Sequence, residues 1–538
     1  MRPRFQLAAL TSLAATLCTG PLPAQGTVHP AARPKLVVFL TIDQMRADYL
    51  DRWSGQLTGG LARLRTGGAV FTNAYQDHGV TETAPGHSVT MSGRFPRSTG
   101  ILRNTAGVED PQSPLLTSRD APASPYRFRG SVLMDWLRAR DTNSRGLSIS
   151  RKDRGAILPM GRAKQSVFWY ATSNGEFTTS RYYADSLPAW IKAVNARRVP
   201  QRAAGRIWSP LLEPGAYTEP DSVAVENNGQ DIAFPHQLSA DTTRSAAAFP
   251  GTPWMDPLTL DAALAGVQAL NLGRGPQPDI LAISLSATDY IGHRWGPDSR
   301  EQHDNILRLD RSLGAFIDSL YKIRDSSTIV FALTADHGVT SFPEVAGMRA
   351  HREAAPQYDL SSAVEGLRSA LRAAQVDTTA ITLDGPLVYV DRAAFTRAGV
   401  DRAPILERFA AFTRTLTSIA RVDRVSDLAT RDTVRDAVTR RWVHMIPPDS
   451  PVEYVLTPVE GAYPAGATIA EHGAPYDDDA HVPLVFYGPM FKAGRYPMRA
   501  LVADAAPTLA FVLGVPPTER LDGRVLGQAI TGGTPPAR

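Results

Sequence analysis

The chain has 538 residues, of which 43% are hydrophobic, and its formal net charge at pH 7 is only +4. This length and composition are enough for one large α/β domain with insertions, or for several smaller units, with a sizeable core. So small an excess of positive charge gives no indication of a nucleic-acid partner, which would need a strongly basic surface.

Residues 1–24 have the parts of a secretory signal peptide. Residues 1–4 form a basic start, an apolar run covers 7–17, and a small-residue exit lies at 22–24. We therefore expect an exported protein, periplasmic or extracellular once this segment is removed. No other stretch offers an apolar run long enough to span a membrane. The single cysteine, Cys18, lies inside the segment, so any metal site in the mature chain must use oxygen and nitrogen ligands.

Four short apolar runs predict buried strands of the kind found in parallel sheets, at residues 36–42, 280–285, 328–333 and 482–487. Between the second and third runs, the apolar positions from Ile306 to Leu320 fall on one face of a helix. Strand, helix and strand in this order favour an α/β fold with right-handed crossovers.

Other parts of the chain are less informative. Residues 105–130 and 172–260 are rich in Pro, Ser, Arg and Ala without a sustained period, and we predict loops or irregular insertions there. Residues 345–469 contain two helical patterns, near 360–374 and 402–417, so we predict an inserted subdomain.

One hydroxyl group stands at a sharp break before a short helical pattern. Thr83 lies just ahead of the Pro85-Gly86 pair that breaks the preceding segment. A threonine in this position is close to helix N–H groups, where anions are stabilised. Two roles are open on these residues alone: a nucleophile, or an ordinary helix N-cap that satisfies a backbone donor.

Acidic and imidazole side chains adjoin the predicted strands. In chain order they are Asp43, Asp289, His293, Asp336, His337 and His472. Ligands of open α/β sheets gather beyond the carboxyl ends of the strands. A single strand-terminal Asp is read as a turn or helix cap, but three of them, two with a histidine close behind, predict a metal site. Carboxylate and imidazole without thiolate suit catalytic zinc, with manganese or iron as alternatives.

The combination resembles the alkaline phosphatase superfamily, in the branch whose nucleophile is a threonine. The motifs that carry the resemblance are Asp43, Thr83-Ala84-Pro85-Gly86-His87, Asp289-x-x-x-His293, Asp336-His337-Gly338 and His472-Gly473. The resemblance implies a three-layer α/β sandwich with a largely parallel central sheet, formed by residues 35–344 and 470–527. Residues 345–469 are then an inserted subdomain, and 528–538 are expected to form a disordered tail.

The resemblance also implies two zinc ions and a phosphothreonine intermediate. One zinc ion would be held by Asp289, His293 and His472, and the other by Asp43, Asp336, His337 and the nucleophile Thr83. Two ions about 4 Å apart can clamp the attacking and the departing oxygen of an in-line phosphoryl displacement. We interpret His87 as a structural residue behind the nucleophile, since most histidines are not ligands.

Two further motifs concern the phosphoryl group. The segment ending in Asn104 resembles the one whose Asn donates to a phosphoryl oxygen in both the monoesterase and the nucleotide pyrophosphatase/phosphodiesterase branches. Residues 150–156 are similar to the Ser-x-Lys-Asp-Arg-x-Ala motif of PafA-like bacterial alkaline phosphatases, which implies that Lys152 and Arg154 contact the transferred group. Without that comparison, a solvated charged loop is the ordinary interpretation. A monoester carries close to two negative charges, so these two cations favour it over a diester.

We therefore predict an exported alkaline phosphatase that hydrolyses small-molecule phosphate monoesters to alcohol and inorganic phosphate. A phosphodiesterase or nucleotide pyrophosphatase of the same superfamily is the alternative, and a non-catalytic exported binding protein is a more distant one. A sulfatase is disfavoured, because the arginine of its Cys/Ser-x-Pro-x-Arg motif would fall at position 87, which is His. No nucleic-acid polymer is expected as a partner, and a monomer is favoured.

Overall fold

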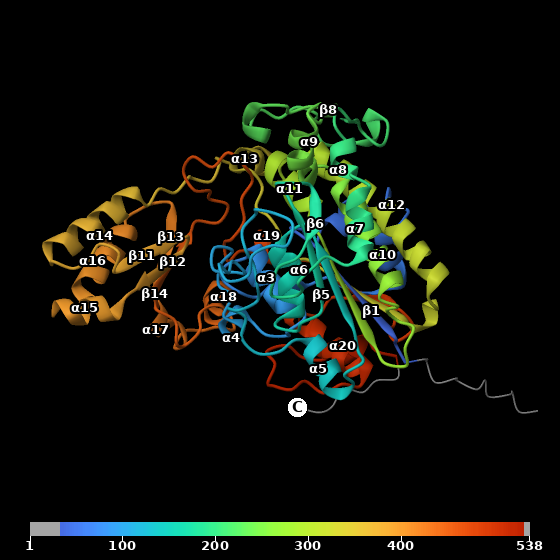
Figure 1. Cartoon of the computed structure of the whole chain (residues 1–538). Coiled ribbons are helices and arrows are strands. Elements are labelled where there is room, and N and C mark those ends of the chain that lie inside the picture. The colour runs from blue at the N-terminus through green and yellow to red at the C-terminus, as the bar shows by residue number, and fades with distance from the viewer. Residues whose placement is uncertain (1–32, 532–538) are drawn as a thin grey trace, which may run out of the picture.

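The computed structural model describes residues 33–531 (Figure 1). The predicted signal peptide, residues 1–24, lies outside the described residues. Among the helices between residues 33 and 531, none combines the length and the apolar character that crossing a membrane requires.

A nine-stranded sheet forms the centre of the fold. Five adjacent strands of this sheet pair parallel, in the order β10 (Ile329–Thr334), β1 (Leu36–Ile42), β9 (Asp279–Leu285), β4 (Gly146–Ser150) and β5 (Ser166–Ala171). All residues of β1, β9 and β10 are buried, as their continuous apolar sequences predict. The strands predicted at 36–42, 280–285 and 328–333 are thereby confirmed.

Helices cover both faces of this sheet (Figure 1). Residues of β1 alternate between two hydrophobic clusters, with Val38 in one and Val37 in the other. The first cluster includes residues of α10 (Met255–Ala269) and α12 (Arg300–Ile323), and the second includes residues of α5 (Leu133–Arg140) and α20 (Ala505–Leu513). The molecule is therefore a three-layer α/β sandwich, and the predicted apolar helix face from Ile306 to Leu320 is the buried face of α12.

The fourth predicted strand differs from expectation in its direction. β15 (Leu484–Tyr487) pairs antiparallel with β10, and β2 (Ala69–Phe71) and β16 (Gly494–Tyr496) extend that edge of the sheet. An antiparallel strand begins at the edge where β10 ends. For this reason residues that precede β15, His472 among them, reach the same edge as residues that follow β10.

Two other expectations also need correction. Residues 172–260 are not only loops, since they include β6 (Glu176–Thr178), α7 (Ala189–Ala196) and α9 (Thr242–Ala248). Helices of seven or eight residues are too short to give a sustained period in the sequence. The start of the predicted tail is also ordered, because the side chain of Ile530 is buried in the core and its backbone forms an antiparallel β-bridge with Phe491. Residues 532–538 lie outside the described residues.

Residues 345–469 contain a separate antiparallel sheet with the strand order β11 (Ile381–Asp384), β12 (Leu387–Val390), β14 (Val452–Pro458) and β13 (Ile419–Arg424). The helices α14 (Ser361–Ala373) and α16 (Ala403–Thr413) lie where the sequence predicted them. This unit has a hydrophobic cluster of its own, which includes Leu367, Phe409 and Leu456. It projects from one side of the core, as the orange part of Figure 1 shows.

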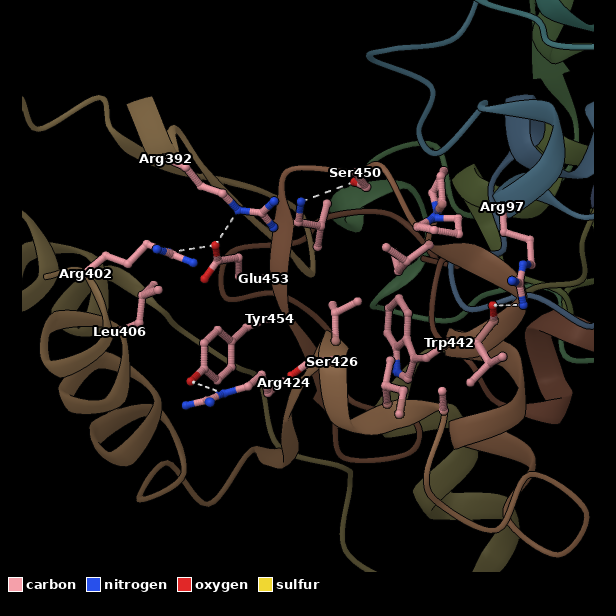
Figure 2. Close-up of a pocket in the computed structure, with 18 of the residues that line it drawn as sticks. Arg97, Arg392, Arg402, Leu406, Arg424, Ser426, Trp442, Ser450, Glu453 and Tyr454 are labelled. Carbon is pink, nitrogen blue, oxygen red and sulfur yellow. Dashed lines mark hydrogen bonds and ion pairs between the residues drawn. The ribbon is translucent and has the colours of Figure 1, made fainter. Parts of the chain in front are cut away.

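Arginines of this unit surround a cavity of about 650 Å³ (Figure 2). Glu453 Oε1 accepts hydrogen bonds from Arg392 Nε at 2.8 Å and from Arg402 Nε at 2.9 Å. Arg424 Nε donates to the hydroxyl of Tyr454 at 3.2 Å. These contacts tie α15 (Arg392–Ala398) and the start of α16 to β14. None of the described residues around this cavity is a predicted site residue.

Candidate active site

Thr83 is the first residue of α3 (Thr83–Thr90), a helix whose residues are all buried. Glu82, and not Thr83, stands at the N-cap position. The Thr83 hydroxyl lies 3.2 Å from Lys152 Nζ and 3.4 Å from His337 Nε2. Gly86 allows this placement, because a Cβ atom there would lie 2.0 Å from the backbone oxygen of Asp336. The hydroxyl is thus held against a cluster of charged groups.

Lys152 is at the centre of that cluster. Its ammonium lies 2.8 Å from Asp43 Oδ2 and 2.7 Å from Asp289 Oδ2, and its side chain is only 3% exposed. Asp43 directly follows β1, whereas Asp289 lies in α11 (Ala287–Trp295), which follows β9. The interpretation of residues 150–156 as a solvated charged loop is therefore wrong, because Lys152 is buried between carboxylates from two strand ends.

Negative charge exceeds positive charge in this buried cluster. Asp43, Asp289 and Asp336 are at most 3% exposed, and Lys152 contacts two of them. Burial and the charges of Asp289 and Asp336 raise the pKa of Asp43 well above its usual value. Asp43 Oδ1 is buried without a hydrogen-bond partner in residues 33–531. Such a carboxylate oxygen fits a bound cation.

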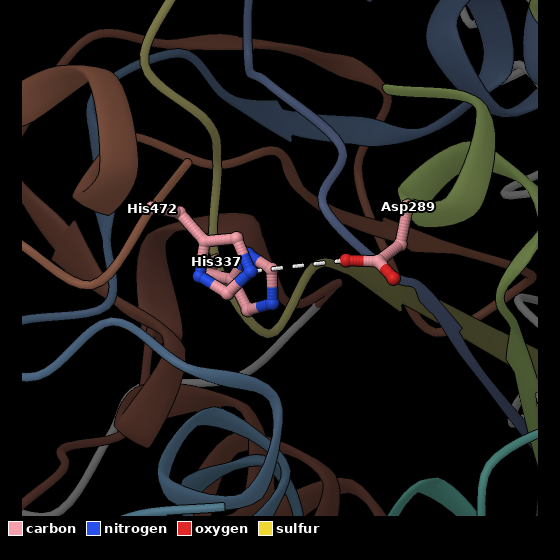
Figure 3. A group of neighbouring side chains, drawn as sticks. All are labelled: Asp289, His337 and His472. Atoms are coloured by element: carbon pink, nitrogen blue, oxygen red, sulfur yellow. Dashed lines mark ion pairs between the residues drawn. The ribbon is translucent and has the colours of Figure 1, made fainter. Parts of the chain in front are cut away.

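Within residues 33–531, two groups of side chains could hold a metal ion, with ligand atoms within 4.8 Å of one another. One group is Asp289, His337 and His472 (Figure 3), and the other is Asp43, Asp336 and His337. In Figure 3 the His337 and His472 rings overlap and both face Asp289. Their centroids are 3.7 Å apart.

His293 lies against the first of these groups. Its Nε2 atom is 3.2 Å from Asp289 Oδ1 and 3.2 Å from His472 Nε2. All six predicted carboxylate and imidazole ligands therefore come together in one place. The geometric groups differ from the predicted sets in two respects, since His337 belongs to both groups and His293 to neither.

Backbone carbonyl groups orient the three imidazole rings. His293 Nδ1 faces the oxygen of Ala470, while the Nδ1 atoms of His472 and His337 lie 2.8 Å from carbonyl oxygens of Thr81 and Gly338. A hydrogen bond from Nδ1–H to a carbonyl leaves Nε2 with its lone pair directed at the carboxylate cluster. This is the arrangement that imidazole ligands of metals use.

His87 and Gln44 support the candidate ligands through contacts that the sequence did not predict. His87 Nδ1 lies 3.0 Å from Asp336 Oδ2, and its Nε2 lies 2.9 Å from Ser284 Oγ, so this buried ring holds a candidate ligand in position. Gln44 donates from its side chain to Asp289 Oδ1 and from its backbone to Asp336 Oδ1, both at 3.1 Å. No sequence signal marked Gln44, apart from its place after Asp43.

Asn104 and Arg154 each bring to the same site hydrogen-bond donors that can bind an anion. Asn104 Oδ1 accepts the Ala84 N–H at 2.8 Å, which leaves the Nδ2 amino group as the donor of that side chain. Arg154 Nε is buried without a hydrogen-bond partner among the described residues. The nearest acidic group to its guanidinium is Asp153, 3.4 Å from Nη1. Both side chains can therefore donate to an anion.

Glu82 connects the nucleophile segment to the inserted unit. Its Oε2 accepts the Asn104 N–H at 2.8 Å, and its Oε1 lies 2.8 Å from Arg103 Nη2. Arg103 Nη1 in turn lies 3.4 Å from Oδ1 of Asp384, which is the last residue of β11. The other carboxylate oxygen of Asp384 accepts a hydrogen bond from the Thr105 hydroxyl at 2.6 Å. This chain of contacts spans parts of the sequence that no local pattern relates.

Residues 37–377 match the family model described as type I phosphodiesterase / nucleotide pyrophosphatase. The chain belongs to this family. Alkaline phosphatase PhoV of Synechococcus elongatus is 29% identical over 528 residues, with 93% of this chain and 94% of that protein covered. Alkaline phosphatase PafA of Elizabethkingia meningoseptica is 33% identical over 361 residues, with 63% of this chain and 66% of that protein covered.

A solved structure agrees with these sequence matches. The crystal structure of wild-type alkaline phosphatase PafA has a TM-score of 0.86 and 26% identity, and the match covers 94% of this chain and all of that one. The predicted resemblance to PafA-like alkaline phosphatases and the predicted sandwich are thus confirmed. The chain is a phosphatase hydrolase of the alkaline phosphatase superfamily.

Proposed function

We propose that the protein is an exported phosphate monoesterase that uses Thr83 as its nucleophile at a site with two zinc ions. The observation that carries the proposal is the position of Thr83 Oγ1, at a helix N-terminus and 3.2 Å from Lys152 Nζ. The alkaline phosphatases among its relatives support a reaction on phosphate monoesters. Periplasmic or extracellular location is proposed from the signal-like residues 1–24 alone.

The side chains fit two divalent cations. Asp289, His293 and His472 would hold one zinc ion, and Asp43, Asp336, His337 and Thr83 the other. Two dications would offset the excess of buried carboxylates over the single ammonium of Lys152. When bound, zinc supplies Lewis-acid stabilisation of the oxygens in phosphoryl transfer and lowers the pKa of a coordinated hydroxyl.

In the first half of the proposed reaction, Thr83 Oγ1 attacks phosphorus in line, the bond from phosphorus to the alcohol oxygen breaks, and phosphothreonine forms. Lys152 Nζ donates to Thr83 Oγ1 and so stabilises the oxygen as its proton passes to solvent, while the departing alcohol oxygen takes up a proton from solvent. In the second half, water cleaves the phosphothreonine, which releases phosphate and restores the hydroxyl. Asn104 Nδ2, Lys152 and Arg154 hold the phosphoryl oxygens during both steps.

Lys152 and Arg154 are the basis for preferring monoesters. A transferred group with two negative charges gains more from an ammonium and a guanidinium than a group with one charge. A diester also carries a second substituent in the space that these donors use. The alternative, a phosphodiesterase, is favoured by one observation, the description of the matching family model.

Turnover of an aryl phosphate monoester and its bis-aryl diester separates the two functions. We expect kcat/KM for the monoester to exceed that for the diester by about 100-fold, which two charge-assisted hydrogen bonds can supply. Thr83→Ala should abolish turnover while about two zinc ions stay bound, and Thr83→Ser should restore part of the activity. A strong preference for the diester would contradict the proposal.

A further inference from the structure

A cavity of about 860 Å³ lies between the core and the inserted unit. Its core-side wall contains Glu82, which precedes the nucleophile, and the candidate ligand His472. Its opposite wall contains Tyr358 and Leu360 of the inserted unit. The volume lies within the range of about 300–1,000 Å³ that is usual for small-molecule sites. A substrate held at Thr83 can therefore extend into this cavity on the His472 side.

Carbon-rich surfaces from both units line the cavity. They include Pro386, Ile419, Leu456, Pro458 and the buried ring of Tyr463. The Tyr463 hydroxyl already donates to the backbone oxygen of Thr340 at 2.7 Å. Its ring is therefore fixed, and the walls suit the hydrocarbon or aromatic part of an alcohol.

Carboxylates outnumber cations in the cavity wall. The acidic residues are Glu82, Asp359, Glu365, Glu471 and Asp479, whereas the basic ones are Arg103 and Arg368. Glu82 already pairs with Arg103, and Glu365 pairs with Arg372, so the wall carboxylates without an ion-pair partner among the described residues are Asp359, Glu471 and Asp479. At the phosphoryl end, in contrast, the two proposed zinc ions would offset the buried carboxylates, and Lys152 and Arg154 would add positive charge. An alcohol that carries a second anion would be repelled by the cavity, and a neutral or cationic one would not.

We infer that this cavity binds the alcohol part of the substrate and selects alcohols that are uncharged or bear an ammonium group. Monoesters of alcohols with a carboxylate or a second phosphate are poor substrates for the same reason. The inference rests on the proposed monoesterase function, to which it adds the class of leaving group.

Three monoesters of para-substituted phenols test the inference, since they share the ring and the leaving oxygen and differ in side-chain charge. They are O-phosphotyramine with an ammonium, 4-ethylphenyl phosphate without a charge, and the phosphate ester of 3-(4-hydroxyphenyl)propanoate with a carboxylate. We expect kcat/KM at low ionic strength to be at least about tenfold higher for the ammonium ester than for the carboxylate ester, and the difference to shrink with added salt.

Two variants show whether the cavity is responsible. Glu471→Gln, beside His472, should lower the ratio of ammonium to carboxylate turnover at least about threefold, while a purely structural effect would lower all three rates together. Val364→Lys places a cation in the half-buried wall of α14 and should raise the carboxylate ester relative to the neutral one. Glu460→Gln is the matched control, because Glu460 is exposed and outside this cavity, and it should leave the ratio unchanged.

Equal kcat/KM for the three esters would overturn the inference, and so would a ratio that moves in neither variant. These results would leave the monoesterase function intact, because all three esters would still be hydrolysed. If none of the three is hydrolysed while a diester is, the proposed function fails and the inference falls with it.

Discussion

Arg154 offers the sharpest test of why this site should prefer monoesters. Its side chain is 26% exposed, its nearest acidic group is its own neighbour Asp153 at 3.4 Å, and its Nε lacks a hydrogen-bond partner within the described chain. Arg154→Ala should therefore change stability little. It should remove a charge-assisted hydrogen bond to the phosphoryl group, about 1.5–3 kcal/mol, which corresponds to a loss of about 10- to 150-fold in kcat/KM.

The assay is release of nitrophenolate from 4-nitrophenyl phosphate and from its methyl diester. The loss should fall mainly on the monoester, with a loss of about tenfold or less on the diester, because the diester has one charge where the guanidinium acts. Arg151→Ala is the control. The Arg151 guanidinium lies over the Tyr290 ring at 4.3 Å and donates to the Thr172 hydroxyl at 3.2 Å. Equal losses on both esters, or an equal effect of Arg151→Ala, would refute the charge-based preference.

Three further predictions concern the surroundings of the site. Glu82→Gln should lower kcat/KM for the monoester by about tenfold with zinc content unchanged, because Glu82 Oε2 accepts the Asn104 N–H at 2.8 Å and Glu82 pairs with Arg103. Unchanged kinetics would exclude this positioning role. Asp336→Asn should reduce bound zinc, measured by metal analysis after dialysis, from two ions to about one per chain, whereas two retained ions would contradict the predicted ligand set. Asp256 in α10 is buried, accepts the Ala287 N–H at the start of α11, and has its pKa raised by burial to about 7. The unfolded chain releases the proton of the Asp256 carboxyl near pH 4, so this residue lowers the stability of the folded protein increasingly as pH rises from about 4 through 7. The Tm of Asp256→Asn should therefore rise relative to that of the natural protein over this range. A Tm difference that does not depend on pH would contradict this prediction.

Much of the core could be predicted from the sequence, because strands buried on both faces leave a continuous apolar run. The bounds of β1 were predicted to the residue, and those of β9 and β10 to within one. The candidate ligands could be found for the same reason, since Asp43 and Asp336 stand one or two positions beyond such runs. Parallel strands then bring these ends to one edge of the sheet.

Features that depend on distant contacts could not be predicted. The antiparallel direction of β15 leaves no mark in its apolar sequence, because a buried strand reads the same in either direction. The burial of Lys152 comes from carboxylates at two other strand ends, and the contact between Arg103 and Asp384 joins residues far apart in the chain. Local periodicity contains no information about such pairs.

The role of Thr83 can be tested most directly by trapping its covalent intermediate. The protein is mixed with an aryl monoester labelled in the phosphoryl group, quenched in acid within the first turnover, and digested for peptide mapping. We predict label on the peptide that contains Thr83, as phosphothreonine, and no label with Thr83→Ala. Label on another residue, or full monoester turnover by Thr83→Ala, would contradict the account.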